Sequence, residues 1–185
     1  RGYNGEIIIG GVPLNEVNET NLMQRVVLVR HNSYLFKGTV EENLKMAKPD
    51  ATKEEMEAVL QKVNLLGFLQ TQLLEKASNL SGGQCQRLVI ARALLRTDSA
   101  VYIFDEAASN IDVESEELIM NVIHELAKTK TVLLISHRLA NVVKSDKIYF
   151  LKDGEIKESG KHDELMSQNG AYRHLYESQM ALENY

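Results

Sequence analysis

Two short stretches carry side chains whose types and spacing could do chemistry on a phosphate group. In the first, Asn79–Arg87, Ser81 and Gln84 have the spacing of a capping box at the start of a helix. Gly82 and Gly83, just inside that start, leave backbone N–H groups uncovered at the positive end of the helix dipole. We therefore expect a phosphate-sized anion site at this turn.

The second stretch, Val101–Glu106, places two carboxylates after an apolar run. Val101–Phe104 contains β-branched and aromatic residues, which is typical of a strand buried on both faces of a parallel sheet. Ligands of open α/β sheets bind at the carboxyl ends of the strands, so Asp105 and Glu106 are placed for a metal ion and a reacting water. Taken singly, the two stretches could also be a plain turn and a solvated strand end.

Together these motifs resemble the ATP-binding cassette (ABC) family. Leu80–Gln84 is similar to its signature motif, and Val101–Glu106 to its Walker B strand with the following glutamate. Ser109–Asp112 is similar to its D-loop, and His137, which follows Thr131–Ser136, to its switch histidine. The order and spacing of these motifs agree with the family over nearly the whole chain.

The resemblance implies an α/β, P-loop NTPase-like fold, with a mostly parallel sheet and an inserted all-helical signature lobe. Within one partial ABC ATPase domain, 1–185, we expect the signature lobe at about 45–97, the Walker B and switch core at 98–160 and C-terminal helices at 161–185. The phosphate-loop pattern G-x-x-x-x-G-K-[ST] does not occur in the sequence. In the family this loop lies just upstream of the matched region, so the resemblance implies an N-terminally truncated domain.

Hydrophobic periodicity and capping residues place the secondary structure. Thr52 and Glu55 form a capping box, and Gly67 is expected to end the helix that they begin. A second short helix is expected at 65–74. The other expected elements are strands at 6–9, 26–29 and 131–135, a hairpin at 148–156 with a tight turn at Asp153–Gly154, a helix capped by Asp112, and helices in the tail from 162 to 180.

The resemblance also implies catalytic roles. In the family, two such domains form a head-to-tail dimer in which each ATP lies between the Walker motifs of one chain and the signature of the other. Asp105 would hold Mg²⁺, Glu106 would polarise the attacking water, and His137 would reach the γ-phosphate. The implied activity is ATP hydrolysis coupled to transmembrane transport.

The remaining nucleotide-binding positions follow from the same motifs. Ser81, Gly82, Gly83 and Gln84 would close on the nucleotide of the partner domain, and Asp112 belongs to the D-loop. His31 stands where the family has a glutamine that touches Mg²⁺ and the attacking water. An imidazole titrates near neutral pH and prefers softer metals than Mg²⁺, so this substitution bears on the efficiency of the site.

Two further positions depart from the family pattern: Cys85 replaces the usual arginine or glutamine after the signature, and Ala108 replaces a threonine. The mixture fits either an ordinary site with tolerated changes or one half of a heterodimer whose two sites are unequal. A non-catalytic binding or dimerisation module and a soluble ABC ATPase are alternative readings.

Leu35–Leu44 is similar to the segment by which exporter-type cassettes follow the loop at His31. In the family this segment docks on the membrane domains of the transporter, although Leu35 and Phe36 could simply be buried beneath the loop. No apolar run approaches the roughly 18 residues of a membrane span, so the resemblance implies a domain at the cytoplasmic face of the cell membrane. A formal charge of −5 argues against a surface that binds nucleic acid.

Overall fold

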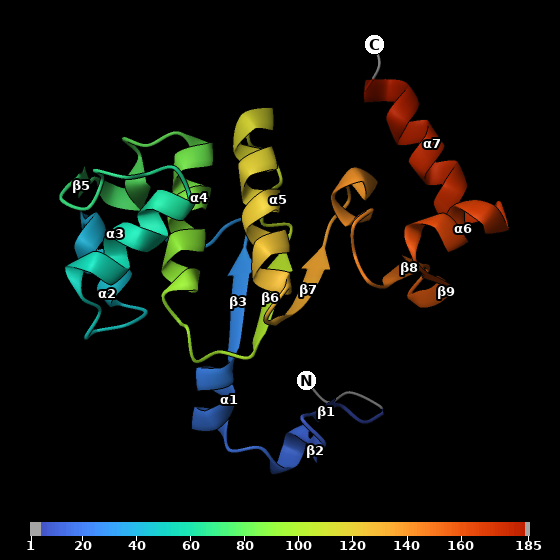
Figure 1. The fold of residues 1–185 in the computed structure, drawn as a ribbon, viewed down its shortest axis with the longest axis horizontal. Coiled ribbons are helices and arrows are strands. Elements are labelled where there is room, and N and C mark those ends of the chain that lie inside the picture. The colour runs from blue at the N-terminus through green and yellow to red at the C-terminus, as the bar shows by residue number, and fades with distance from the viewer. Residues whose placement is uncertain (1–4, 184–185) are drawn as a thin grey trace.

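The computed structural model describes residues 5–183 and consists of a parallel sheet, a helical lobe on one side of it and a smaller C-terminal part on the other (Figure 1). Residues 1–4 and 184–185 lie outside the described part. The strands are β1 (Ile8–Ile9), β2 (Val12–Pro13), β3 (Val26–Arg30), β4 (Gly38–Thr39), β5 (Gln72–Leu73), β6 (Val101–Asp105), β7 (Thr131–Ile135), β8 (Ile148–Lys152) and β9 (Glu155–Gly160).

The helices are α1 (Glu19–Arg25), α2 (Val40–Lys45), α3 (Lys53–Lys62), α4 (Gly82–Leu94), α5 (Val113–Ala127), α6 (His162–Gln168) and α7 (Ala171–Glu183). Three short 3₁₀ helices, η1 (Leu14–Glu16), η2 (Glu75–Ala77) and η3 (Leu139–Val142), complete the described elements. The predicted capping boxes at Thr52 and Ser81 and the predicted cap at Asp112 are all present.

The central sheet has three parallel strands, as the sequence predicted, and their order is β3-β6-β7. Helices α4 and α5 lie across one face of it (Figure 1). The prediction that β6 is buried on both faces was wrong. Its residues alternate between buried and half-buried, and on the face turned away from these helices Leu28 and Leu133 are 48% and 51% exposed. The reason is that α4 and α5 cover only one side.

The lobe around α2, α3 and α4 differs in detail from the expected all-helical structure. Helix α3 ends at Lys62 and not at Gly67, because Asn64 adopts the left-handed backbone conformation, with φ of 54°, that stops the helix. The expected second helix at 65–74 is also absent. This segment forms turns and then β5, which pairs antiparallel with β4.

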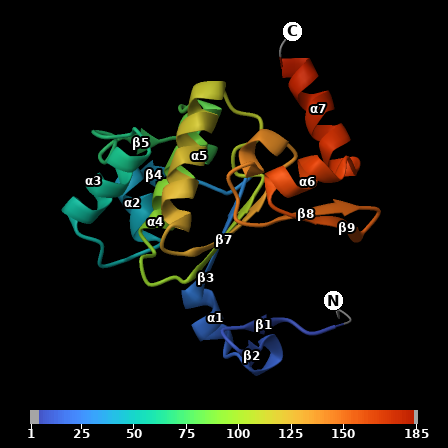
Figure 2. The same ribbon diagram turned by 45° about the vertical axis from the view of Figure 1, so that its right-hand side comes forward.

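Beyond η3, the C-terminal part has its own small core. The predicted hairpin is present as β8 and β9, and α6 and α7 follow it, with α6 against β9 and α7 against η3 (Figure 2). The residues of this core are Leu139, Val142, Ile148, Leu165 and Tyr172, with Leu134, Phe150, Met166 and Tyr176 packed against it. Within residues 5–183, no helix combines the length and the apolar character that a membrane span requires.

Candidate functional site

Glu106 and His137 come together at the carboxyl ends of β6 and β7. The Glu106 Oε1 atom lies 2.6 Å from the His137 Nε2 atom. Both residues line a cavity of about 380 Å³ together with the D-loop residues Ser109 and Asn110. The structure therefore joins two of the residues that the sequence singled out for chemistry, although they come from different strands.

The backbone of Glu106 is held from two sides. Its N–H donates a hydrogen bond to the Ile135 carbonyl at 3.0 Å, and its carbonyl accepts one from the Ser109 hydroxyl at 2.8 Å. Glu106 has a positive φ of 51°, which is uncommon for a residue with a side chain. These contacts hold the strand end in a turn that directs the carboxylate toward His137.

Asp105 ends β6 beside β3, where His31 begins the next loop. The His31 N–H donates to the Asp105 carbonyl at 3.2 Å, and the Arg30 Nε atom lies 3.9 Å from an Asp105 carboxylate oxygen. This carboxylate is 40% exposed, so it is accessible to a cation. The described part of the chain contains no group of three or more His, Cys, Asp or Glu side chains that could hold a metal ion. A single carboxylate is compatible with Mg²⁺, because this ion binds proteins through one or two carboxylates together with substrate phosphates.

The signature turn lies beside the D-loop. A Cβ atom built on Gly83 would come within 2.6 Å of an Asp112 carboxylate oxygen and 2.3 Å of the Ser115 hydroxyl, so only glycine fits there. Asp112 itself caps α5 by accepting a hydrogen bond from the Ser115 N–H at 2.8 Å. That bond, with a second contact from the Ser115 side chain, lowers the pKa of the Asp112 carboxyl below its ordinary value.

Ser81 and Gly82, by contrast, are exposed at the start of α4. Ser81 and Gln84 complete the capping box, with the Gln84 N–H donating to the Ser81 hydroxyl at 3.1 Å. The cavity of Glu106 and His137 is not lined by any residue of this turn. The sequence-predicted residues thus form two groups, both at the end of the molecule where the sheet strands end and α4 and α5 begin (Figure 1).

The departures from the family pattern have different environments. Cys85 is half-buried against the core, where its thiol lies 3.7 Å from the Ala77 carbonyl, and burial raises the pKa of this thiol. Ala108 is buried in the turn after Glu106. The His31 side chain remains exposed.

Sequence reasoning missed two buried polar residues that support the site. The Asn43 side chain accepts a hydrogen bond from the Phe36 N–H and donates one to the Phe36 carbonyl, both at 2.8 Å. Glu116, only 6% exposed, accepts hydrogen bonds from Arg138 and from Asn141. Both could have been predicted as polar residues at helix positions where the periodicity calls for an apolar side chain.

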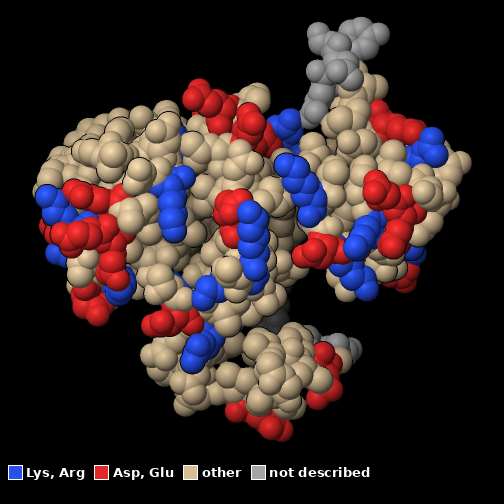
Figure 3. All heavy atoms as spheres, in the orientation of Figure 1, with Lys and Arg blue, Asp and Glu red and all other residues tan. Residues whose placement is uncertain are grey.

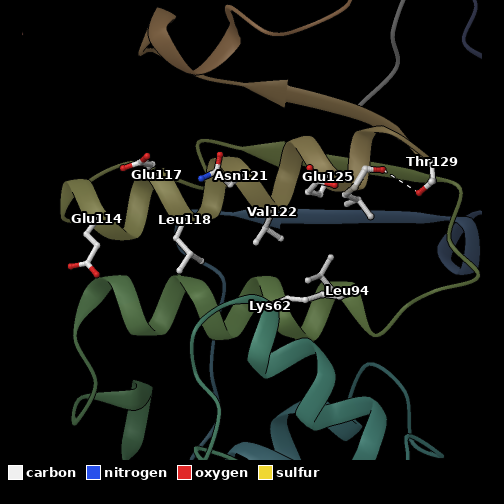
Figure 4. Close-up of a pocket in the computed structure, with 10 residues that line it drawn as sticks. Lys62, Leu94, Glu114, Glu117, Leu118, Asn121, Val122, Glu125 and Thr129 are labelled. Atoms are coloured by element: carbon white, nitrogen blue, oxygen red, sulfur yellow. Dashed lines mark hydrogen bonds between the residues drawn. The ribbon is translucent and has the colours of Figure 1, made fainter.

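A larger groove lies elsewhere. It has a volume of about 760 Å³ between α4 and α5, with Lys62 of α3 at its edge and Leu94, Leu118 and Val122 pointing into it (Figure 4). It contains none of the residues predicted to do chemistry. On the face shown in Figure 3, Lys and Arg are interspersed with Asp and Glu, and no basic patch of the kind that binds nucleic acid is seen on that face.

Comparison with known proteins agrees with this geometry. The profile of the ABC transporter family matches residues 1–109. The chain is 49% identical over 189 residues to an uncharacterized ABC transporter ATP-binding protein of Haemophilus influenzae, covering 99% of this chain and 34% of that protein. It is 40% identical over 185 residues to an ATP-dependent lipid A-core flippase of the same organism, covering 96% of this chain and 31% of the flippase.

A solved structure described as a bacterial Atm1-family ABC exporter with ATP bound superposes with a TM-score of 0.87 at 29% identity, over 96% of this chain and 32% of the exporter chain. The chain spans about a third of the length of these relatives. The chain therefore belongs to the ABC transporter family, and its sequence and fold are those of an exporter-type nucleotide-binding domain.

Proposed function

We propose that this chain is the ATP-binding and ATP-hydrolysing motor domain of an exporter-type ABC transporter, which couples hydrolysis to transmembrane transport. The observation that supports this most is the 2.6 Å contact between Glu106 and His137 at the ends of adjacent parallel strands. A carboxylate and an imidazole in this position are suited to activate a water and to contact a terminal phosphate. The flippase and exporter relatives support the transport role.

In this proposal Asp105, Glu106 and His137 have separate tasks. Asp105 would hold Mg²⁺, which when bound would neutralise charge on the phosphates. Glu106 accepts a hydrogen bond from the attacking water and draws its proton away. The side chain of His137 is 83% exposed, so its ring can contact a γ-phosphate while Nε2 stays near Glu106.

The signature turn serves the nucleotide of a second domain. Ser81, Gly82, Gly83 and Gln84 form the start of a thirteen-residue helix and lie outside the Glu106 cavity. The Ser81 and Gln84 N–H groups are used in the capping box, so the turn would offer an anion the Gly82 and Gly83 N–H groups and the positive end of the helix dipole. This separation is what a head-to-tail dimer, with either an identical or a different partner domain, requires. We also assign His31 and Asp112 to the nucleotide-binding residues, since the His31 backbone contacts Asp105 and the Asp112 carboxylate lies against Gly83 of the signature turn.

An exposed aromatic pair is the surface we assign to the membrane domains. The rings of Tyr34 and Phe36 pack edge to face with centroids 4.8 Å apart and are 45% and 46% exposed. Leu35, between them, is buried. The alternative that Leu35 and Phe36 are both buried beneath the loop therefore holds for Leu35 alone. On this assignment we propose that the domain lies at the cytoplasmic face of a membrane. The proposal keeps the division of the domain into a signature lobe at about 45–97, a Walker B and switch core at 98–160 and C-terminal helices at 161–185.

The proposal is tested in the full-length protein that contains this chain. Glu106→Gln should leave ATP binding nearly intact and slow turnover by about two orders of magnitude or more, because the amide keeps the size of the side chain but cannot accept the proton. Glu117→Gln, the same change at an exposed position of α5, is the control and should hydrolyse ATP at the normal rate. Near-normal turnover in Glu106→Gln would remove Glu106 from the proposed role.

We further propose that the 185 residues alone neither bind ATP tightly nor hydrolyse it. The groups that they offer to a polyanion at this site include two carboxylates, Asp105 and Glu106, and in the family most nucleotide affinity comes from the phosphate-loop pattern that this sequence does not contain. Calorimetry of the purified chain with Mg-ATP measures this. Micromolar binding would contradict the expectation.

A further inference from the structure

We propose that Gln179, on the C-terminal helix α7, is a positioning residue that fixes the switch histidine for catalysis. Its side-chain amide donates a hydrogen bond from Nε2 to the His137 carbonyl at 2.8 Å. Its Oε1 accepts a hydrogen bond from the Leu139 N–H at 2.9 Å. One side chain thus holds the backbone on both sides of Arg138, from a helix about forty residues further along the chain.

His137 needs such support because its ring is held by the contact with Glu106 and by little packing. The side chain is 83% exposed, so packing does not set its position, and the direction of the imidazole depends on where the backbone places it. Local hydrogen bonds between Ser136 and Arg138 shape the turn, and the Arg138 side chain ties it to Glu116 of α5. Gln179 connects the turn to α7.

Helix α7 is itself held firmly. Tyr172, in its first turn, is fully buried in the C-terminal core, and the Ala171 and Tyr172 N–H groups donate to the Glu158 carboxylate. Gln179 follows two helical turns later on this anchored helix. The Gln179 amide therefore connects the C-terminal core to the backbone of the residue proposed to meet the γ-phosphate, and adds to the packing of Leu139 in the same core. This inference rests on the proposed function.

The test uses steady-state ATP hydrolysis by the full-length protein. Gln179→Leu keeps the volume and removes both hydrogen bonds, so kcat should fall about tenfold while KM for ATP stays within about twofold, because displacing a catalytic group by a fraction of an ångström lowers the rate more than the affinity. Gln179→Glu keeps the acceptor for Leu139 but loses the donor to His137, and should be as slow. Glu177→Leu, at an exposed position of the same helix, should match the wild type.

A double-mutant cycle separates positioning from general packing. If Gln179 acts through His137, Gln179→Leu should add no further loss to His137→Ala when both are measured under single-turnover conditions, where slow rates are still resolved. Full additivity would overturn the inference, as would a wild-type kcat in Gln179→Leu. Normal turnover in His137→Ala would instead contradict the proposed role of His137.

Amide hydrogen exchange tests the contact without relying on activity. The segment 136–142 should exchange faster in Gln179→Leu than in Glu177→Leu, because the Leu139 N–H loses its acceptor. Unchanged exchange in this segment would show that the contact does not hold the turn in solution, and would overturn the inference even if ATP hydrolysis proceeds as proposed.

Discussion

Besides its proposed chemical role, Glu106 has a strained backbone conformation. A non-glycine residue with φ of 51° lies in the left-handed region, where a side chain costs roughly 1–2 kcal/mol. The turn is kept because the Ile135 carbonyl and the Ser109 hydroxyl hold the backbone of Glu106. Strain of this kind concentrates at functional sites, where it fixes the direction of a side chain.

The strain can be measured by comparing two substitutions that both remove the contact with His137. Glu106→Gly should be more stable than Glu106→Val by at least about 1 kcal/mol, since glycine adopts positive φ freely and a β-branched residue does not. Urea denaturation of the two variants gives the difference directly. Equal stability of the two would show that the backbone at 106 relaxes out of the left-handed region.

At the scale of elements, α5 is tied to the segment after β7 by one buried carboxylate. Glu116 accepts a hydrogen bond from Asn141 at 2.8 Å and another from Arg138, next to His137. The helix that begins at the D-loop and the turn that carries the switch histidine are therefore joined on the side of the sheet that α5 covers. This link fixes the position of the D-loop end of α5 relative to the turn that carries His137.

Removing the charge of Glu116 should loosen that link. We expect Glu116→Gln to lower the free energy of unfolding by about 1–2 kcal/mol, because hydrogen bonds to a charged group are stronger than those to a neutral amide. Glu117→Gln, on the exposed side of α5, should stay within about 0.5 kcal/mol of the wild type. Denaturant unfolding of both variants decides the matter, and equal effects would mean that Glu116 contributes no more than a surface residue.

For the whole molecule, the main feature is the uncovered face of the central sheet. Leu28, Ile103 and Leu133 stand in one row across the three strands, and Ile135 follows along β7 with 44% of its surface exposed. An apolar face of this kind is unfavourable in water and tends to be buried by association.

We therefore expect the purified 185-residue chain to self-associate. Leu133→Lys should shift it toward the monomer, because a charge in the middle of the apolar row opposes burial. Leu151→Lys, on the hairpin strand β8 where the side chain is 64% exposed, is the control and should leave association unchanged. Light scattering measures the mass of each variant, and a monomeric wild-type chain would contradict this account of the sheet face.

Features that depend on neighbouring residues could be predicted from the sequence. The capping boxes at Thr52 and Ser81, the cap at Asp112 and the hairpin turn at Asp153–Gly154 are formed by side chains and backbone groups a few residues apart. The order of the motifs likewise predicted the three parallel strands and the residues that end them. These parts could be read because their hydrogen bonds are local.

Features that depend on residues far apart in the sequence became visible only in the folded chain. The segment at 65–74 lost its predicted helix because β5 pairs with β4, about thirty residues earlier. The contact of Glu106 with His137 follows from the parallel register of β6 and β7. The hydrogen bond from Gln179 to the His137 carbonyl forms only because α7 packs beside the switch turn. The sheet face left exposed depends on which helices cover it. A single sequence does not show such pairings, because the free energy of each comes from surfaces that meet only when the chain has folded.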